Sequence, residues 1–229
     1  MKSSSALINR SFRRHLSPVL RESGFDRVDA RNAWKWENNC IWVFNIHAVG
    51  SYFSSVTGWP PSSVCAWLGI FFEFISSRVT LKKDPIGRDL PPEYLCHIRA
   101  HLETAIDQDE LTRGFSNPAE RRRKDIWWLD PGGANSEEVT RDIVTIFKQV
   151  ALPWYQKYSD LNNVLTAIED QRNCLNKFAF GTLIAQKLGQ VELEAKYRSL
   201  AEKEAERIGF TRNKETPHTA IVVQPAGAA

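Results

Sequence analysis

The chain has 229 residues, of which 42% are hydrophobic, and its formal net charge at pH 7 is +3. This length and apolar content suffice for one domain with a sizeable core, with or without an appendage, so no disulfide scaffold is needed. The longest apolar stretch, residues 64–75, has about half of the residues that a membrane-spanning helix needs, so we expect no membrane span. The small net charge lacks the concentrated basic excess of a dedicated nucleic-acid binder, which argues against nucleic acid as a partner.

The N-terminal segment and the cysteines bear on location. Residues 1–20 are rich in Ser and Arg, as an organellar transit peptide is. Their apolar residues recur at helical spacing with arginines opposite, and this pattern favours an amphipathic first helix, which Pro18 bends or continues as its last turn. We expect the cysteines, which form no CxxC pair, to be free buried thiols in a reducing cytoplasm; they are Cys40, Cys65, Cys96 and Cys174.

The first half of the chain predicts a sheet. Trp34 and Trp36 lie on one face of a strand, and a polar turn lets residues 40–49 return as the second strand of a hairpin. Residues 64–75 are apolar on both faces, which is typical of a central strand covered on both sides. Residues 50–63 combine aromatic side chains with glycine and prolines, which indicates a structured loop held by its own rings.

Two later segments complete the predicted sheet. Residues 94–103 alternate apolar and polar side chains, which favours a strand with one polar face and leaves a short helix as the alternative. Residues 125–130 have strand composition and stop at a Pro-Gly-Gly turn, so we expect the last strand there. Residues 78–92, rich in proline and charge, form the long connection before them.

Helical periodicity governs the chain from Ser136 onward. We expect Pro153 to end the first helix and Ser159 to cap the next. Two further helices, closed at Gly189 and Gly209, form a helical hairpin that resembles a single tetratricopeptide unit without a second copy. The sequence thus predicts an α+β fold, with a mostly antiparallel sheet, an N-terminal helix, flanking helices and a C-terminal helical hairpin.

We divide the chain into three parts. Residues 1–170 form the α+β sheet domain, and residues 171–210 form the helical hairpin packed on it. Residues 211–229 have the composition of a disordered tail.

The polar face of the strand at residues 94–103 is the sharpest chemical candidate. Alternate residues project side by side, and two imidazoles with a carboxylate, His97, His101 and Glu103, can hold a divalent metal. The simpler interpretation is a half-solvated sheet face, because no second ligand cluster completes a coordination shell. His47 is the one obvious further residue that could join His97, His101 and Glu103 as a metal ligand.

A basic run precedes the last predicted strand: Arg121, Arg122, Arg123 and Lys124. It permits phosphate binding beside a stacking tryptophan, as in single-strand nucleic-acid binding, or contact with an anionic protein. It also fits a solvated loop paired with Glu120 and Asp125. Trp59, beside two prolines in a loop, is expected to be partly exposed and to contact a partner, whereas most of the tryptophans are expected in the core.

Known catalytic and cofactor motifs do not occur. The sequence has no GxGxxG, GxxxxGK[ST], HExxH or GxSxG pattern, so we expect no cofactor. No set of residues identifies an enzyme, and whether the protein is one stays open.

The order of these landmarks resembles an uncharacterised bacterial family, domain-of-unknown-function family 4304. The likeness rests on five features over about the first 170 residues: the first helix leading to Gly24-Phe25, the Trp34-Lys35-Trp36 hairpin, the strand from Val43 to Gly50, the strand from Asp125 to Leu129, and the helix ending at Leu152-Pro153-Trp154. The resemblance implies an α+β fold in the bacterial cytosol and carries no catalytic residues.

Two functional hypotheses follow from the sequence. The first is a non-enzymatic protein-interaction or accessory domain, immunity-like by analogy of size, that binds another protein through Trp59 and the three arginines Arg121, Arg122 and Arg123. The alternative is a metal-dependent hydrolase centred on the His97/His101 strand face. The oligomeric state has no signal in the sequence.

Overall fold

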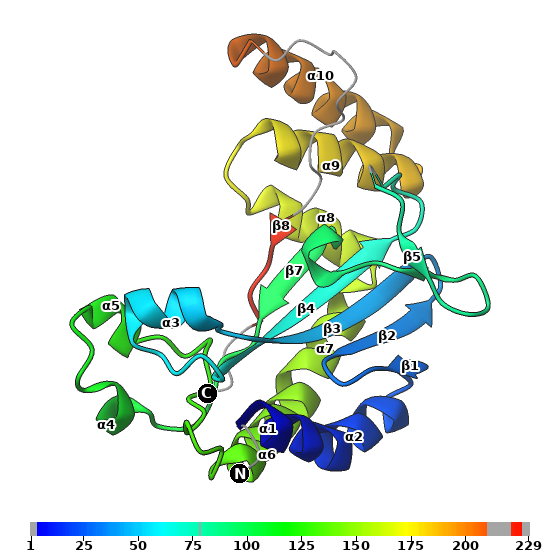
Figure 1. Ribbon diagram of the computed structural model, residues 1–229. Coiled ribbons are helices and arrows are strands. Elements are labelled where there is room, and N and C mark those ends of the chain that lie inside the picture. The colour runs from blue at the N-terminus through cyan, green and yellow to red at the C-terminus, as the bar shows by residue number, and fades with distance from the viewer. Residues whose placement is uncertain (1–3, 78, 210–220, 226–229) are drawn as a thin grey trace.

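In the computed structural model, which describes residues 4–77, 79–209 and 221–225, a mixed sheet stands between helices and smaller elements (Figure 1). The described strands of this sheet follow the order β1 (Arg27–Val28), β2 (Asn32–Glu37), β3 (Cys40–Ala48), β4 (Val64–Phe72), β7 (Ile98–His101) and β8 (Ile221–Val222). All neighbours are antiparallel except β7 and β8, which are parallel. The α+β prediction is confirmed.

The predicted hairpin and central strand both form. Asn39, with a φ of 68°, makes the turn between β2 and β3. Trp42, Phe44 and Ile46 of β3 point to one face, here called the back face, where they join the main core. Ile41 and Val43 point to the opposite, front face. β4 is buried on both faces, as its unbroken apolar sequence predicts.

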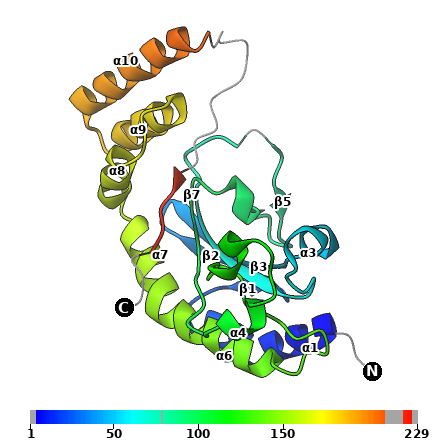
Figure 2. The same cartoon turned by 90° about the vertical axis from the view of Figure 1, so that its left-hand side faces the viewer.

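Two long helical stretches cover the back face. The first comprises α1 (Ser4–Ser11), the π-helical segment η1 (Phe12–Leu16) and α2 (Ser17–Glu22). The second comprises α6 (Ser136–Ile146), the π-helical segment η3 (Phe147–Ala151) and α7 (Leu152–Tyr158), and α1 packs against α6. Figure 2 shows α6 and α7 following one side of the sheet, with α3 and β5 on the other.

The prediction that Pro153 ends a helix is wrong. Proline has no N–H and its ring clashes with the carbonyl four residues earlier, which normally breaks a helix. Here the preceding turn widens, and Leu152 N–H donates to the Phe147 carbonyl, five residues back. The same device precedes Pro18, where Ser17 N–H donates to the Phe12 carbonyl, so both helices continue past their prolines.

The predicted cap at Ser159 is displaced by one residue. α6 begins after Asn135, and α8 (Leu161–Glu169) begins after Asp160, whose side chain accepts a hydrogen bond from Asn162 N–H at 2.9 Å. Ser159 instead accepts a hydrogen bond from the Trp42 indole at 2.7 Å. Its hydroxyl therefore ties the end of α7 to the sheet.

The C-terminal helical hairpin consists of α9 (Leu175–Lys187) and α10 (Val191–Arg207), and its turns use left-handed Gly189 and Gly209. Phe180 of α9 packs beside the ring of Phe72 at 6.4 Å between centroids, so the hairpin meets the end of the central strand. The division of the chain at residue 170 stays a prediction. None of the helices in the described ranges is long and apolar enough to cross a membrane.

Small elements occupy the front of the sheet. They are α3 (Ser51–Thr57), β5 (Lys82–Lys83), β6 (Asp89–Leu90), the 3-10 turn η2 (Glu93–Leu95), α4 (Asp109–Thr112) and α5 (Pro118–Arg121). The predicted loop at residues 50–63 therefore contains a helix. The predicted last strand at residues 125–130 is reduced to a single bridge between Trp127 and Val64, because the chain only touches the end of β4 there.

The C-terminal tail and one cysteine also differ from expectation. Most of the predicted disordered tail, residues 211–220 and 226–229, lies outside the described residues. Ile221 and Val222, however, form β8 on the edge of β7. All four cysteines are free, as expected, but Cys174 is exposed because it begins α9 from the preceding loop.

Candidate functional site

Part of the front face projects beyond the sheet and carries the basic run and Trp59. We call it the side lobe: residues 50–63 with α3, and residues 107–128 with α4 and α5 (Figure 1, left). Its interior is a separate apolar cluster of Trp59, Cys65, Phe115 and Ile126. The Trp59 and Phe115 rings meet edge to face at 5.4 Å between centroids, which joins the two segments of the lobe.

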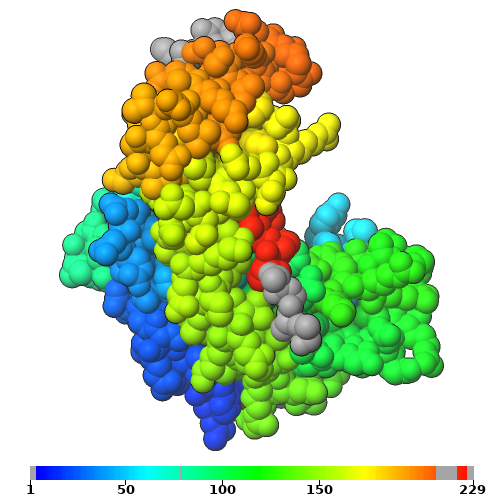
Figure 3. Space-filling view, turned by 180° about the vertical axis from the view of Figure 1, so that it is seen from behind, coloured from blue at the N-terminus to red at the C-terminus, as the bar shows by residue number. Residues whose placement is uncertain are grey.

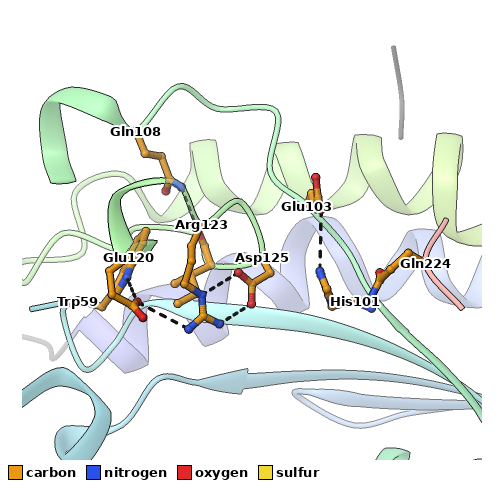
Figure 4. Close-up of polar contacts among 9 residues, drawn as sticks. Trp59, His101, Glu103, Gln108, Glu120, Arg123, Asp125 and Gln224 are labelled. Atoms are coloured by element: carbon orange, nitrogen blue, oxygen red, sulfur yellow. Dashed lines mark hydrogen bonds and ion pairs between the residues drawn. The ribbon is translucent and has the colours of Figure 1, made fainter. Parts of the chain in front are cut away.

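The predicted exposure of Trp59 is wrong, because its side chain is 0% exposed. Its indole nitrogen donates a hydrogen bond to Glu120 Oε2 at 3.0 Å (Figure 4). The loop that carries Trp59 folds inward over Phe115 and Trp128 rather than forming a tip. Trp59 thus supports the lobe from within and presents no surface to a partner.

Arg123 also belongs to this internal frame. Its guanidinium binds Asp125, with Nε 2.8 Å from Oδ1, and lies 3.6 Å from Glu120 Oε2. The hydrogen bonds to Asp125 raise the pKa of Arg123. Burial alone would raise the pKa of Asp125, but the hydrogen bonds and charge of Arg123 outweigh it and lower that pKa. The predicted pairing of the basic loop with Glu120 and Asp125 is confirmed.

Gln108 completes the frame, and no sequence pattern predicted this role. Its amide nitrogen donates to the Ile126 carbonyl at 2.9 Å, and its amide oxygen accepts from Trp128 N–H. A single buried glutamine therefore does the pairing that a neighbouring strand would otherwise provide for residues 126–128.

The outer surface of the lobe combines apolar and basic side chains. Tyr52 and Val56, one helical turn apart on α3, are 86% and 70% exposed. Arg121 and Arg122 are exposed, and neither has a carboxylate within 4.0 Å among the described residues. Arg121 Nε donates to the Phe115 carbonyl at 2.8 Å, which holds its side chain against the lobe. Periodicity missed Tyr52 and Val56, because residues 50–63 gave no helical signal.

Comparison with known protein families matches residues 16–157 to the family described as Domain of unknown function (DUF4304). The chain belongs to the DUF4304 family. The matched region includes the sheet from β1 to β7, the side lobe and α7, whereas the α9–α10 hairpin and β8 lie beyond it. Searches of curated proteins and of solved structures gave no match.

The metal site that the sequence offers as an alternative does not form in the described part of this DUF4304 chain. His97 is buried, and its Nδ1 accepts a hydrogen bond from Phe72 N–H at 2.9 Å, so this nitrogen is occupied within the protein. Its ring packs against Phe71 and Phe180, whereas His101 packs against Trp67. The described residues contain no group of three or more His, Cys, Asp or Glu side chains that could hold a metal.

The predicted ligands do not converge because of where β7 begins. The strand begins at Ile98, after the η2 turn, so the alternation that the sequence predicts from residue 94 holds only from there. Glu103 follows the strand, and its Oε1 is 3.9 Å from His101 Nε2. Arg99 binds Glu93 through two hydrogen bonds, at 2.6 and 3.1 Å. His97 therefore lies apart from the pair His101 and Glu103, and the polar residues of the predicted face do not converge on one point.

A polar row crosses the centre of the front face. Asn32, Asn45, Trp67 and His101 stand opposite one another on β2, β3, β4 and β7. His47, the other proposed ligand, stacks on Trp67 at 6.3 Å, and partial burial, with the charge of Arg31, lowers its pKa. Because Trp67 stands on the strand between them, the two imidazoles contact the indole instead of converging.

Proposed function

We propose that this DUF4304 protein is a protein-interaction domain whose side lobe binds a partner with an acidic and partly apolar surface. The exposed pair Tyr52 and Val56, on the same lobe as Arg121 and Arg122, is the observation that carries the proposal. Tyrosine and arginine are enriched at binding hot spots, and exposed apolar side chains that gather in one patch rimmed by polar residues mark interaction sites.

The internal frame supports this proposal by making the lobe rigid. Trp59, Glu120, Arg123 and Asp125 hold the two segments of the lobe together, so the exposed side chains lose little conformational freedom when they bind. The partner contacts proposed from the sequence are thereby revised. Arg121 and Arg122 remain surface contacts, while Trp59 and Arg123 act as supports.

The cellular setting is part of the same proposal. Four free thiols favour a reducing compartment, which agrees with the bacterial cytosol implied by the family resemblance. There, an accessory role of the immunity type would consist of binding another protein and blocking its action.

The test is purification of the tagged protein from its host at physiological salt, identification of the partner, and titration calorimetry with the purified pair. Tyr52→Ala and Arg122→Glu should each weaken binding by about tenfold or more, since hot-spot truncations cost at least ~1–2 kcal/mol. Two controls match them in exposure: Val191→Ala on α10, where Val191 is 73% exposed, and Arg172→Glu.

The controls decide the outcome. Retained binding in Val191→Ala and Arg172→Glu, with loss in the lobe variants and unchanged melting temperatures, supports the side lobe as the interface. If all four variants bind the partner equally well, the side lobe is not the interface.

A further inference from the structure

The last described segment of the chain returns to the sheet and occupies the edge of β7. Ile221 stands opposite Ile98, and Val222 opposite Arg99, in a parallel pair. Figure 1 shows this short strand in red beside β7, and Figure 3 shows it at the molecular surface next to α7. Residues 210–220, which lie between Gly209 and this strand in the sequence, are outside the described residues.

Main-chain hydrogen bonds fix the register of the segment. Ile221 N–H donates to the His97 carbonyl, and Val223 N–H donates to the Arg99 carbonyl, both at 2.8 Å. The Val223 carbonyl accepts a hydrogen bond from the Trp154 indole of α7, also at 2.8 Å. These bonds recognise an extended backbone and do not depend on which side chains it carries.

Side chains of the segment add selectivity. Ile221 is 6% exposed and belongs to the main core, whereas Val222 is 50% exposed. Gln224 donates from Nε2 to His101 Nδ1 at 2.8 Å, and its Oε1 accepts from His101 N–H at 3.4 Å. The edge of β7 therefore accepts an apolar side chain at the Ile221 position and any side chain at the Val222 position. It accepts an apolar side chain at the Val223 position and an amide at the Gln224 position.

The segment pairs with the sheet over fewer residues than the central strands do. β3 and β4 pair along their whole length, while β8 contributes two residues in a parallel pair, the less stable arrangement per residue. An edge strand with unpaired carbonyls is a template for another extended chain, and addition of a strand is a common mode of peptide recognition.

We propose that the outer edge of β7 is a binding site for an extended segment of a partner protein, and that residues 221–224 occupy it in cis until the partner displaces them. The partner segment runs parallel to β7 and carries an apolar residue for the Ile221 position and Gln or Asn for the Gln224 position. This surface is separate from the side lobe, and its test does not depend on that proposal.

The test measures binding of a fluorescent peptide with the sequence of residues 220–225, Ala-Ile-Val-Val-Gln-Pro, to the full chain. In the wild type the cis segment competes, so the apparent affinity is reduced by the fraction of open edge. Ile221→Asp expels the cis segment and should bind the peptide about tenfold more tightly or better. Val222→Asp, at the exposed position, should behave like the wild type.

A second variant tests the site itself. Trp154→Phe removes the indole N–H that holds the Val223 carbonyl, so in the Ile221→Asp background it should weaken peptide binding several-fold. A peptide with Asp in place of its isoleucine should not bind. If Ile221→Asp binds the peptide no more tightly than Val222→Asp does, the proposal is wrong.

Two further measurements apply to the wild type and remain valid if Ile221→Asp fails to fold. Hydrogen exchange of the Ile221 and Val223 amides should be much faster than that of the Phe44 amide in β3; equally slow exchange would show that the edge does not open and would overturn the proposal. A concentration-dependent dimer that Ile221→Asp abolishes would assign the edge to the tail of a second copy, which also overturns it.

Discussion

The back and front faces of the sheet bury their side chains in different ways. On the back, residues from β3 and β4 meet two long helical stretches in one continuous core. On the front, two smaller clusters lie at opposite ends, one around Trp34 and Phe71 and one in the side lobe, with a polar row between them. The back face therefore belongs to the larger cluster of buried apolar residues, while the front face keeps polar groups between its two smaller clusters.

The largest effect should come from the back face. Phe44 is buried against Phe147, with 5.2 Å between ring centroids, so Phe44→Ala leaves a cavity in the main core. We expect the free energy of unfolding to fall by about 3–5 kcal/mol, measured by urea denaturation. A loss below 1 kcal/mol would mean that the back face does not form one cooperative core.

We expect a smaller loss of stability from a substitution on the front of the central strand, where the packing is tightest. A Cβ at Gly69 would lie 2.5 Å from Cys96 Sγ, so Gly69→Ala should cost about 1–3 kcal/mol through overpacking. Gly114, in the side lobe, has no heavy atom within 4 Å of an added Cβ. Gly114→Ala is therefore the matched control, and equal denaturation midpoints for the two variants would contradict the packing at Gly69.

The next largest loss of stability is expected from a substitution in the internal frame of the side lobe. Trp59→Phe removes the N–H that Glu120 accepts and should cost about 1–2 kcal/mol. Trp36 is the control, because its indole nitrogen is buried without a hydrogen-bond partner among the described residues. Trp36→Phe removes no hydrogen bond and keeps an aromatic ring beneath the Arg88 guanidinium, so it should cost less than Trp59→Phe. Thermal unfolding of both variants checks the difference, and a reversed order would show that the Glu120 bond does not hold the lobe.

The smallest effect depends on pH and involves Asp125. Its pKa is lower in the folded protein than the ordinary value of 3.8, so its pairing with Arg123 stabilises the fold above that value and is lost as the pH falls through the lowered pKa. Asp125→Asn should be less stable than the wild type by about 1 kcal/mol at neutral pH, because the pair is partly exposed. Denaturation at several pH values should show this difference shrinking below pH 3.8; a constant difference would exclude the ion pair as its cause.

Sequence periodicity predicted the back face well. Apolar spacing predicted the first helix, the β2–β3 hairpin, the central strand and the helices after residue 136. The spacing shows which side of an element is buried, and this does not depend on which other element packs against it. The family assignment followed from the order of the same elements and is confirmed over residues 16–157. The boundary at Pro153 could not be predicted, because a widened turn absorbs the proline.

The candidate site was predicted only in part. Arg121 and Arg122 are exposed as expected, and Arg123 pairs with Glu120 and Asp125. Local sequence gave no sign that Trp59 is internal, since Glu120, which binds it, lies 61 residues away. The separation of His97 from His101 likewise depends on where η2 ends and β7 begins.

The sequence by itself determined the α+β fold, the order of most elements and the free thiols, because apolar spacing and composition act within a few residues of chain. The tertiary structure decided which surfaces are open: it buried Trp59, exposed Tyr52 and Val56, and placed residues 221–222 on the edge of β7. The physical reason is that exposure depends on what else packs against a side chain, and in this protein those neighbours come from distant parts of the chain.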